Sequence, residues 1–173
     1  MAVRTGYLLR MEEGASTGEA VMTTEQDKWL DEARALREQK PRGLLFLCVA
    51  NSARSQMAEG IARSMAPEGV TVWSAGSKPN LVRPEAGAVL EEIGIDISAH
   101  RAKAVAEIPA AEVDTVITLC GEEECPLFLG KATRLHWGLP DPAGVEGDET
   151  VRLDAFRQTR DELHRRLAVV FGK

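Results

Sequence analysis

Residues 44–60 read LLFLCVANSARSQMAEG, and this stretch decides the fold class. Residues 44–47 form a short, wholly apolar run, which is typical of a β-strand buried on both faces. Cys48 ends this run, and apolar side chains then recur at helical spacing from Met57 to Met65. A buried strand that passes through a short loop into a helix beginning near Ser55 predicts the first unit of an α/β fold.

The alternation of strand and helix continues along the chain. Further strands are predicted at 70–73, 113–119 and 133–136, and helices at 84–93, 102–108 and 149–171. Within residues 84–93 the helical spacing places Ile93 among the inward-facing residues. This order predicts one α/β domain over residues 43–173, in which a four-stranded parallel sheet is flanked by helices on both faces.

Residues 1–42 precede this pattern as an N-terminal extension. Residues 1–22 show no sustained hydrophobic period, so we expect them to be disordered or loosely attached. Residues 24–39 predict an amphipathic helix with Thr24 as its N-cap. The apolar stripe of this helix consists of Trp29, Leu30, Ala33 and Leu36.

Charge and cysteine content narrow the function classes. The 173 residues carry 27 acidic and 21 basic side chains, a net charge of -6 that disfavours nucleic acid or an anionic membrane as partner. No apolar run reaches the roughly 18 residues of a membrane helix or forms a signal-peptide core, so we expect a cytoplasmic protein. Three cysteines make a poor disulfide framework, and in a reducing compartment such cysteines are usually catalytic or redox-active.

The loop after the first strand has the features of an oxyanion site. Its residues are Val49, Ala50, Asn51, Ser52, Ala53, Arg54 and Ser55. Loop and helix N–H groups can cradle a tetrahedral oxyanion, to which Arg54 adds a two-pronged donor. The same environment favours a Cys48 thiolate, which Ser55 can stabilise, while Asn51 and Ser52 can brace the loop. The alternative is that Cys48 is a core residue and Arg54 a solvated surface charge. The C-x5-R-S spacing between strand and helix favours the oxyanion site.

The segment CVANSARSQMAEG at 48–60 resembles the low-molecular-weight tyrosine phosphatase superfamily, and in particular the arsenate reductases built on that fold. Further matches are SAG at 74–76, GIDIS at 94–98, TLCG at 118–121, CP at 125–126, HWG at 136–138 and DP at 141–142. The resemblance covers residues 43–171 and implies the phosphatase-like fold. It also implies that Asp141 is the general acid, although an Asp-Pro turn is the alternative for this dipeptide.

The second and third cysteines distinguish a reductase from a phosphatase, which needs only one. Cys120 follows a strand, so it lies on the same sheet edge as Cys48, and Cys125 follows five residues later. The resemblance implies a relay, in which Cys48 attacks arsenate, Cys120 attacks Cys48 and releases arsenite, and Cys125 receives the disulfide. A thioredoxin-type reductant then resets the enzyme. Taken separately, Cys120 could be a core residue, Cys125 an incidental loop residue, or both could bind zinc with His136.

Several residues depart from the family pattern. Four residues, three of them glutamates, separate Cys120 from Cys125, where the best-known members have a longer segment. A shorter loop restricts Cys125, and the acids slow thiol exchange by disfavouring a neighbouring thiolate. Val49 and Ala50 stand where many relatives have Thr-Gly. The phosphatases follow Asp-Pro with aromatic residues, whereas Ala, Gly and Val occupy 143–145 here, which favours a small inorganic substrate.

A potassium ion lies behind the loop in some arsenate reductases of this type. Asn51, Glu59 and Ser74 match three of its ligand positions, but the family's further aspartate has no match near Lys103. No tightly bound cofactor is expected otherwise. His136 and Trp137 are as readily structural as catalytic, and His100 and His164 are expected at the surface.

The sequence therefore predicts a thioredoxin-dependent arsenate reductase for arsenic detoxification, with phosphate or sulfate as competing oxyanions. A weak phosphatase side activity is compatible with this interpretation. The alternatives are a low-molecular-weight phosphatase and a non-catalytic oxyanion or redox sensor. The sequence leaves open whether a low-molecular-weight thiol replaces thioredoxin and whether Cys125 is essential.

Overall fold

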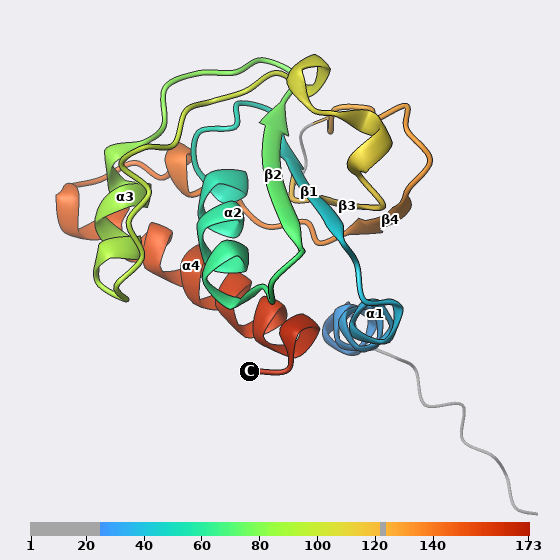
Figure 1. The fold of residues 1–173 in the computed structure, drawn as a ribbon. Coiled ribbons are helices and arrows are strands. Elements are labelled where there is room, and N and C mark those ends of the chain that lie inside the picture. Colours follow the sequence, from blue (N-terminus) through green and yellow to red (C-terminus); the bar gives the residue numbers. More distant parts are fainter. Residues whose placement is uncertain (1–24, 122–123) are drawn as a thin grey trace, which may run out of the picture.

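The computed structural model describes residues 25–121 and 124–173, which form a parallel sheet covered on both faces (Figure 1). The four strands are β1 (Gly43–Cys48), β2 (Thr71–Gly76), β3 (Thr115–Thr118) and β4 (Thr133–His136). They lie in the order β2-β1-β3-β4 and all pairs are parallel. Cys48 is in register with Gly76, and Leu47 with Thr118, so the strands end together at one edge of the sheet. This edge carries the candidate active site.

The four α-helices share one core cluster with one face of the sheet. They are α1 (Glu25–Gln39), α2 (Arg54–Met65), α3 (Pro84–Glu91) and α4 (Glu149–Phe171). Side chains alternate along a strand, so Leu44 and Phe46 of β1 pack into this cluster while Leu45 and Leu47 point to the opposite face. Figure 1 shows α2 and α4 together on one side of the sheet.

Two 3-10 helices, η1 (Val105–Glu107) and η2 (Ala110–Glu112), lie on the opposite side. The prediction of a four-stranded parallel sheet flanked by helices is confirmed. The helix predicted at 102–108 is only the three-residue turn η1. The start of the predicted helix is extended instead, because Ala104 forms a parallel bridge with Gly76 and the Lys103 carbonyl accepts from the Gly76 N–H.

The N-terminal helix α1 is part of the main core. Trp29, Ala33 and Leu36 are buried against the cluster, and the Arg165 guanidinium of α4 lies 4.6 Å from the centre of the Trp29 ring. The predicted apolar stripe is therefore confirmed. The expected disorder of residues 1–22 and the N-cap at Thr24 lie outside the described residues.

The prediction for Ile93 is wrong, since its side chain is 41% exposed. Helix α3 ends at Glu91, so Ile93 lies beyond the helix, and Gly94 with φ of +77° then turns the chain away from the core.

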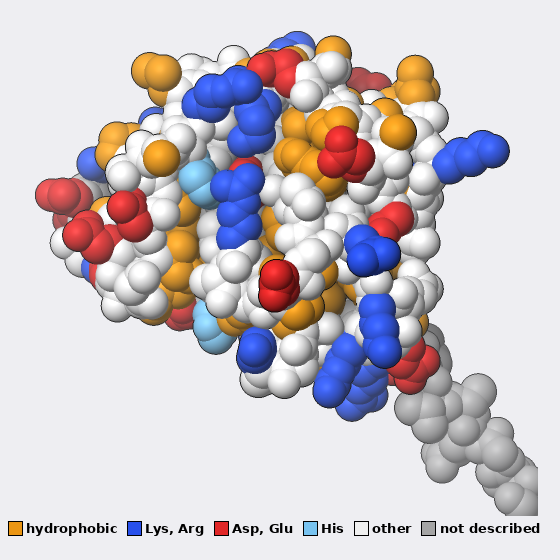
Figure 2. All heavy atoms as spheres, viewed as in Figure 1, with side chains coloured by type: hydrophobic (Ala, Val, Ile, Leu, Met, Phe, Trp, Pro, Cys, Tyr) orange, Lys and Arg blue, Asp and Glu red, His pale blue; other side chains and the backbone are white. Residues whose placement is uncertain are grey.

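Acidic and basic side chains both occur across the face in Figure 2. Within the part of the chain that the structure describes, no helix is long and apolar enough to cross a membrane.

Candidate active site

The site begins where β1 ends and the chain turns into α2. Asn51 has φ of +46°, in the left-handed region, and this turn brings the loop back over Cys48. Gly76 at the end of β2 permits the close approach, because a Cβ there would lie 2.4 Å from the Val49 carbonyl oxygen. The loop is thus seated directly against the neighbouring strand.

Cys48 lies at the bottom of this loop and is 2% exposed. Its Sγ is 2.8 Å from Ser55 Oγ, and the Asn51 N–H donates to it at 3.2 Å. Both groups can stabilise a thiolate, as predicted for Ser55. Helix α2 starts at Arg54 without a side-chain cap at Ala53, so the N–H groups of its first turn remain suited to an oxyanion.

Arg54 and Asp141 complete a hollow above the sulfur. This hollow has a volume of about 370 Å³ and is lined by Cys48, Val49, Ala50, Ser52, Ala53, Arg54 and Asp141. The Arg54 guanidinium is 4% exposed, donates to the Leu139 carbonyl at 2.9 Å, and lies 3.8 Å from Asp141 Oδ2. The alternative of a solvated arginine is therefore wrong, because packing and backbone carbonyls orient Arg54 toward the hollow.

The position of Asp141 is compatible with both roles weighed for it from the sequence, the turn and the general acid. Its Oδ1 accepts from the Ala143 N–H at 3.1 Å, which caps the turn η3 (Pro142–Gly144). Its Oδ2 faces Arg54, and the side chain is 46% exposed at the rim of the hollow. A carboxyl group in this place can hand a proton to an oxygen bound above Cys48.

Behind the loop, Asn51 is the centre of a buried hydrogen-bond network. Its Nδ2 donates to Ser55 Oγ and Ser74 Oγ, both at 2.8 Å. Its Oδ1 accepts from Gln56 Nε2 at 3.0 Å and from the Lys103 N–H at 2.8 Å. Asn51 therefore braces the loop as predicted, while Ser52 contributes its carbonyl, which accepts from the Arg83 N–H.

The predicted potassium ligands Asn51, Glu59 and Ser74 do lie together, but their oxygens are already engaged. Glu59 is 1% exposed, accepts a hydrogen bond from Ser74 Oγ, and pairs with both Lys103 and Arg63. Asn51 directs its amide nitrogen, not its oxygen, toward Ser74. A cation needs free oxygens at this point, so the residues present do not fit a potassium ion.

Cys120 and Cys125 form a disulfide with a Cα–Cα distance of 5.6 Å. Four intervening residues are thus enough for the pairing that the resemblance implied. Cys120 is fully buried at the end of β3, whereas Cys125 is half-buried and Cys48 is a free thiol. The two paired sulfurs cannot serve as zinc ligands in this state, and residues 25–121 and 124–173 contain no group of three metal-binding side chains.

Sequence reasoning missed several polar contacts around the site. Gln56 is fully buried and bonds both to Asn51 and to the Arg101 carbonyl. His100, expected at the surface, is half-buried 3.0 Å from Gln56 Oε1, and this burial lowers its pKa despite the nearby Glu59 charge. The only signal for these contacts was a glutamine in the first turn of the predicted helix, and the sequence alone does not show that this side chain turns inward.

His136 and Trp137 have structural contacts. His136 Nδ1 is 2.7 Å from Thr118 Oγ1, and the buried Trp137 indole N–H donates to Glu32 of α1 at 3.2 Å. Trp137 thus connects the N-terminal helix to the segment that leads to Asp141.

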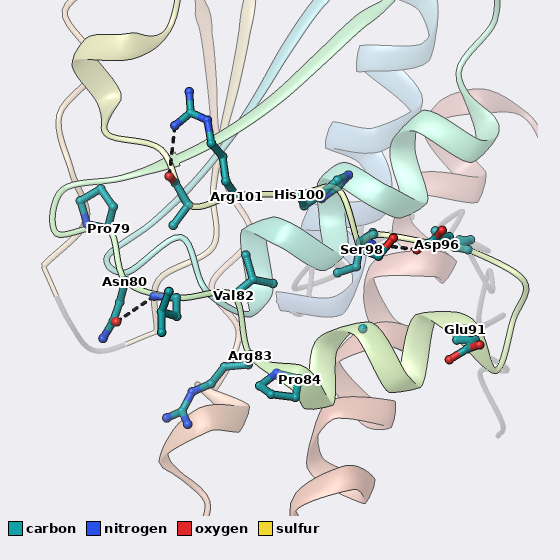
Figure 3. A pocket seen from close by; sticks show the side chains of 15 residues that line it. Pro79, Asn80, Val82, Arg83, Pro84, Glu91, Asp96, Ser98, His100 and Arg101 are labelled. Carbon is teal, nitrogen blue, oxygen red and sulfur yellow. Dashed lines mark hydrogen bonds between the residues drawn. The ribbon is translucent and has the colours of Figure 1, made fainter.

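A larger groove of about 1160 Å³ lies beside the hollow (Figure 3). Arg83 and Pro84 in Figure 3 come from the start of α3, whereas His100 and Arg101 come from the segment before η1. Cys48 does not line this groove. One wall of the groove, residues 79–83, supports the Cys48 loop, because the Asn80 and Arg83 N–H groups donate to carbonyls of that loop.

The fold and this site define a class of cysteine-dependent enzymes that bind a tetrahedral oxyanion at the first loop of a parallel sheet. The chain belongs to the low molecular weight phosphotyrosine protein phosphatase family, whose sequence model matches residues 43–171.

Its relatives include arsenate reductases. The arsenate reductase of Halalkalibacterium halodurans is 39% identical over 126 residues, which cover 72% of this chain and 91% of the relative. A solved arsenate reductase in the phosphate-binding state has a TM-score of 0.64 at 33% identity, and covers 76% of this chain and 97% of that one. The thioredoxin-dependent arsenate reductase of Corynebacterium glutamicum has a TM-score of 0.52 at 29% identity, and the match covers 82% of this chain and 71% of that one.

Proposed function

We propose that the protein is an arsenate reductase, in which three cysteines carry two electrons from a thioredoxin-type dithiol to arsenate. The observation that carries the proposal is the Cys120–Cys125 disulfide at the sheet edge that also holds the Cys48 nucleophile. A phosphatase regenerates its cysteine with water and does not need a redox-active pair of further cysteines. The relatives named arsenate reductase agree with this assignment.

The first step uses the hollow above Cys48. The Cys48 thiolate attacks the arsenic atom of arsenate while Arg54 and the loop N–H groups hold its oxygens. A sulfur–arsenic bond forms, and one arsenic–oxygen bond breaks. Asp141 donates a proton to that oxygen, which leaves as water. The product is a Cys48 thiol–arsenate adduct in which arsenic is still in its +5 state.

The next two steps move electrons between sulfurs. The Cys120 thiolate attacks Cys48 Sγ, and the electron pair of the sulfur–arsenic bond leaves with arsenic, which departs as arsenite in the +3 state. Cys125 then attacks Cys120, so that Cys48 is released as a thiolate and a Cys120–Cys125 disulfide remains. The structure corresponds to this last state, with Cys48 free and the other two cysteines joined.

The external reductant attacks the more accessible sulfur. Cys120 is fully buried, so a dithiol protein reaches the half-buried Cys125 first. Thioredoxin is the reductant we favour, and the Corynebacterium glutamicum relative is thioredoxin-dependent. The electrons come from thiols throughout, so the reaction needs no tightly bound cofactor. The relay needs its thiols restored between turnovers, which favours a reducing compartment, so we propose the cytoplasm as its location and arsenic detoxification as its role.

The hollow suits a small inorganic oxyanion. No aromatic side chain is among the residues that line it, and Ala143 follows the Asp-Pro pair. Arsenate is the substrate, and phosphate and sulfate compete for the same donors because they share its tetrahedral shape. Cys48, Arg54 and Asp141 are also the set a phosphatase uses, so a weak phosphatase activity accompanies the reductase.

The test is arsenate-dependent NADPH oxidation coupled through thioredoxin and thioredoxin reductase. We expect turnover by the wild type and none by Cys125→Ser or Cys120→Ser. Hydrolysis of an aryl phosphate is the control, and it persists in both variants because Cys48, Arg54 and Asp141 are intact. Turnover by Cys125→Ser means that the reductant attacks an earlier disulfide. Aryl phosphate hydrolysis without arsenate turnover in the wild type identifies a phosphatase.

A further inference from the structure

We propose that the ammonium group of Lys103 is a built-in cation that holds the oxyanion-binding loop in its working conformation and makes a bound potassium ion unnecessary. The inference concerns a positioning residue behind the loop. It builds on the proposed function only in taking this loop as the oxyanion site.

The ammonium contacts Glu59, one of the three residues predicted to hold the ion. Lys103 Nζ is 3.2 Å from Glu59 Oε2 and 3.2 Å from the Arg101 carbonyl oxygen, and the side chain is 15% exposed. Glu59 Oε2 also accepts from Ser74 Oγ, which in turn accepts from Asn51 Nδ2. Three hydrogen bonds in series therefore connect the ammonium group to the Asn51 side chain.

Lys103 also holds Asn51 from the other side. Its backbone N–H donates to Asn51 Oδ1 at 2.8 Å, so one end of the amide binds Lys103 directly and the other end reaches Glu59 through Ser74. Asn51 has the left-handed φ of +46°, which asparagine tolerates better than most residues but which still costs free energy that the surrounding contacts offset. In that conformation its N–H points at Cys48 Sγ. The grip on Asn51 thus determines the direction of a donor to the nucleophile.

Each oxygen of the buried Glu59 carboxylate is paired with a different cation. A carboxylate that is 1% exposed requires compensation by cations, because burial removes its solvation by water. Arg63 contacts the other oxygen, Oε1, from a position that is 49% exposed. Only Lys103 among the described residues pairs with Oε2, the oxygen that Ser74 also uses. Removing the ammonium leaves this oxygen and the loop network without their cation.

The experiment measures inorganic phosphate binding at Cys48 without any turnover. In a Cys120→Ser/Cys125→Ser background, iodoacetamide alkylates Cys48 alone, and phosphate protects it. The phosphate concentration for half-protection is measured in potassium chloride and in choline chloride at equal ionic strength. Choline is too large to enter a space vacated by an ammonium group.

The variants differ in the space they leave. We expect Lys103→Ala in choline to require about tenfold more phosphate, the effect of losing one hydrogen bond to a charged group. Potassium restores the half-protecting phosphate concentration of Lys103→Ala to near the wild-type value, because the ion enters the vacated space between Glu59 and the Arg101 carbonyl. Lys103→Met is impaired equally but stays so in potassium, since its side chain fills the space without a charge. The wild type and the control Lys173→Ala, which removes an exposed ammonium, respond equally to both salts.

Three results overturn the proposal. They are wild-type behaviour of Lys103→Ala in choline, failure of potassium to restore it, and a wild type that itself requires potassium. Should Lys103→Ala be unfolded in choline, recovery of its thermal unfolding transition in potassium supports the proposal and absence of recovery overturns it. Arsenate plays no part in these measurements, so the proposed reductase activity can fail while the role of Lys103 stands, and the reverse.

Discussion

At the scale of single residues, two side chains with separate tasks meet above Cys48. Arg54 is buried and is oriented by the Leu139 carbonyl, so its position does not depend on a ligand. Asp141 is at the rim, where one carboxylate oxygen caps a turn and the other faces Arg54. Such preorganisation of donors is what stabilises charge that develops during a reaction.

The proposed role of Asp141 as an acid is separable from its observed role in the turn. Asn at position 141 keeps a side-chain oxygen that can accept from the Ala143 N–H, but its amide is not acidic and cannot transfer a proton to a leaving oxygen. We expect Asp141→Asn to lower kcat for arsenate about a hundredfold, within the range for lost general acid catalysis, with an unchanged melting temperature. Steady-state kinetics and thermal unfolding check this. An unchanged kcat would assign Asp141 to the turn alone.

At the scale of elements, a charged clamp joins α3 to α4. Glu92 follows the end of α3 and accepts hydrogen bonds from Arg157 and Arg160 of α4. These two arginines lower the pKa of Glu92 from 4.5 to about 2, Arg157 having the larger effect. Arg160 also donates to the Val89 carbonyl at 2.8 Å. The clamp holds α3, whose N-terminal side carries the segment that braces the Cys48 loop.

The clamp predicts a pH dependence of stability. Because folding lowers the pKa of Glu92, its contribution is complete above pH 4.5 and is lost as the pH falls toward 2. Glu92→Gln should therefore melt at a lower temperature than the wild type at pH 6, and the difference should shrink below pH 4.5. Thermal unfolding of both proteins from pH 2.5 to 7 measures it. A difference that is constant over this range is incompatible with the clamp.

At the scale of the whole molecule, α1 extends the family fold by one packed helix. The family match begins at residue 43, yet Trp29, Ala33 and Leu36 are buried in the core that α2, α3 and α4 share. Glu32 of the same helix accepts from the Trp137 indole N–H. The N-terminal helix therefore stabilises the core and touches the segment that precedes Asp141.

Removal of the Trp29 ring tests this contribution. The residue is 6% exposed and lies against Arg165 and Arg166 of α4, so Trp29→Ala leaves a cavity between the two helices. We expect a loss of about 3 kcal/mol in the free energy of unfolding, as for other buried aromatic residues. Leu127→Ala is the control, since Leu127 is 82% exposed and its truncation should be nearly neutral. Urea denaturation distinguishes the two, and equal effects would contradict the packing of α1.

Much of the fold was predictable because its signals are local. The strand before Cys48, the helix after it and the stripe on α1 were each readable from spacing within one segment. The prediction failed where contact with a distant segment overrides the local pattern, as the pairing of Ala104 with Gly76 does for the helix at 102–108. For the candidate site, the loop residues were predictable from their own spacing, but their partners from other elements were not.

The sequence by itself determined the oxyanion-binding loop and brought Cys120 within reach of Cys125, because five residues limit how far two side chains can separate. Only the tertiary structure decided what surrounds them. It places Lys103 on Glu59 and Asp141 beside Arg54, and it joins Glu32 to Trp137 across 105 positions. The physical reason is that spacing constrains distances within a segment, whereas contacts between distant segments depend on how the strands align and the helices pack over them.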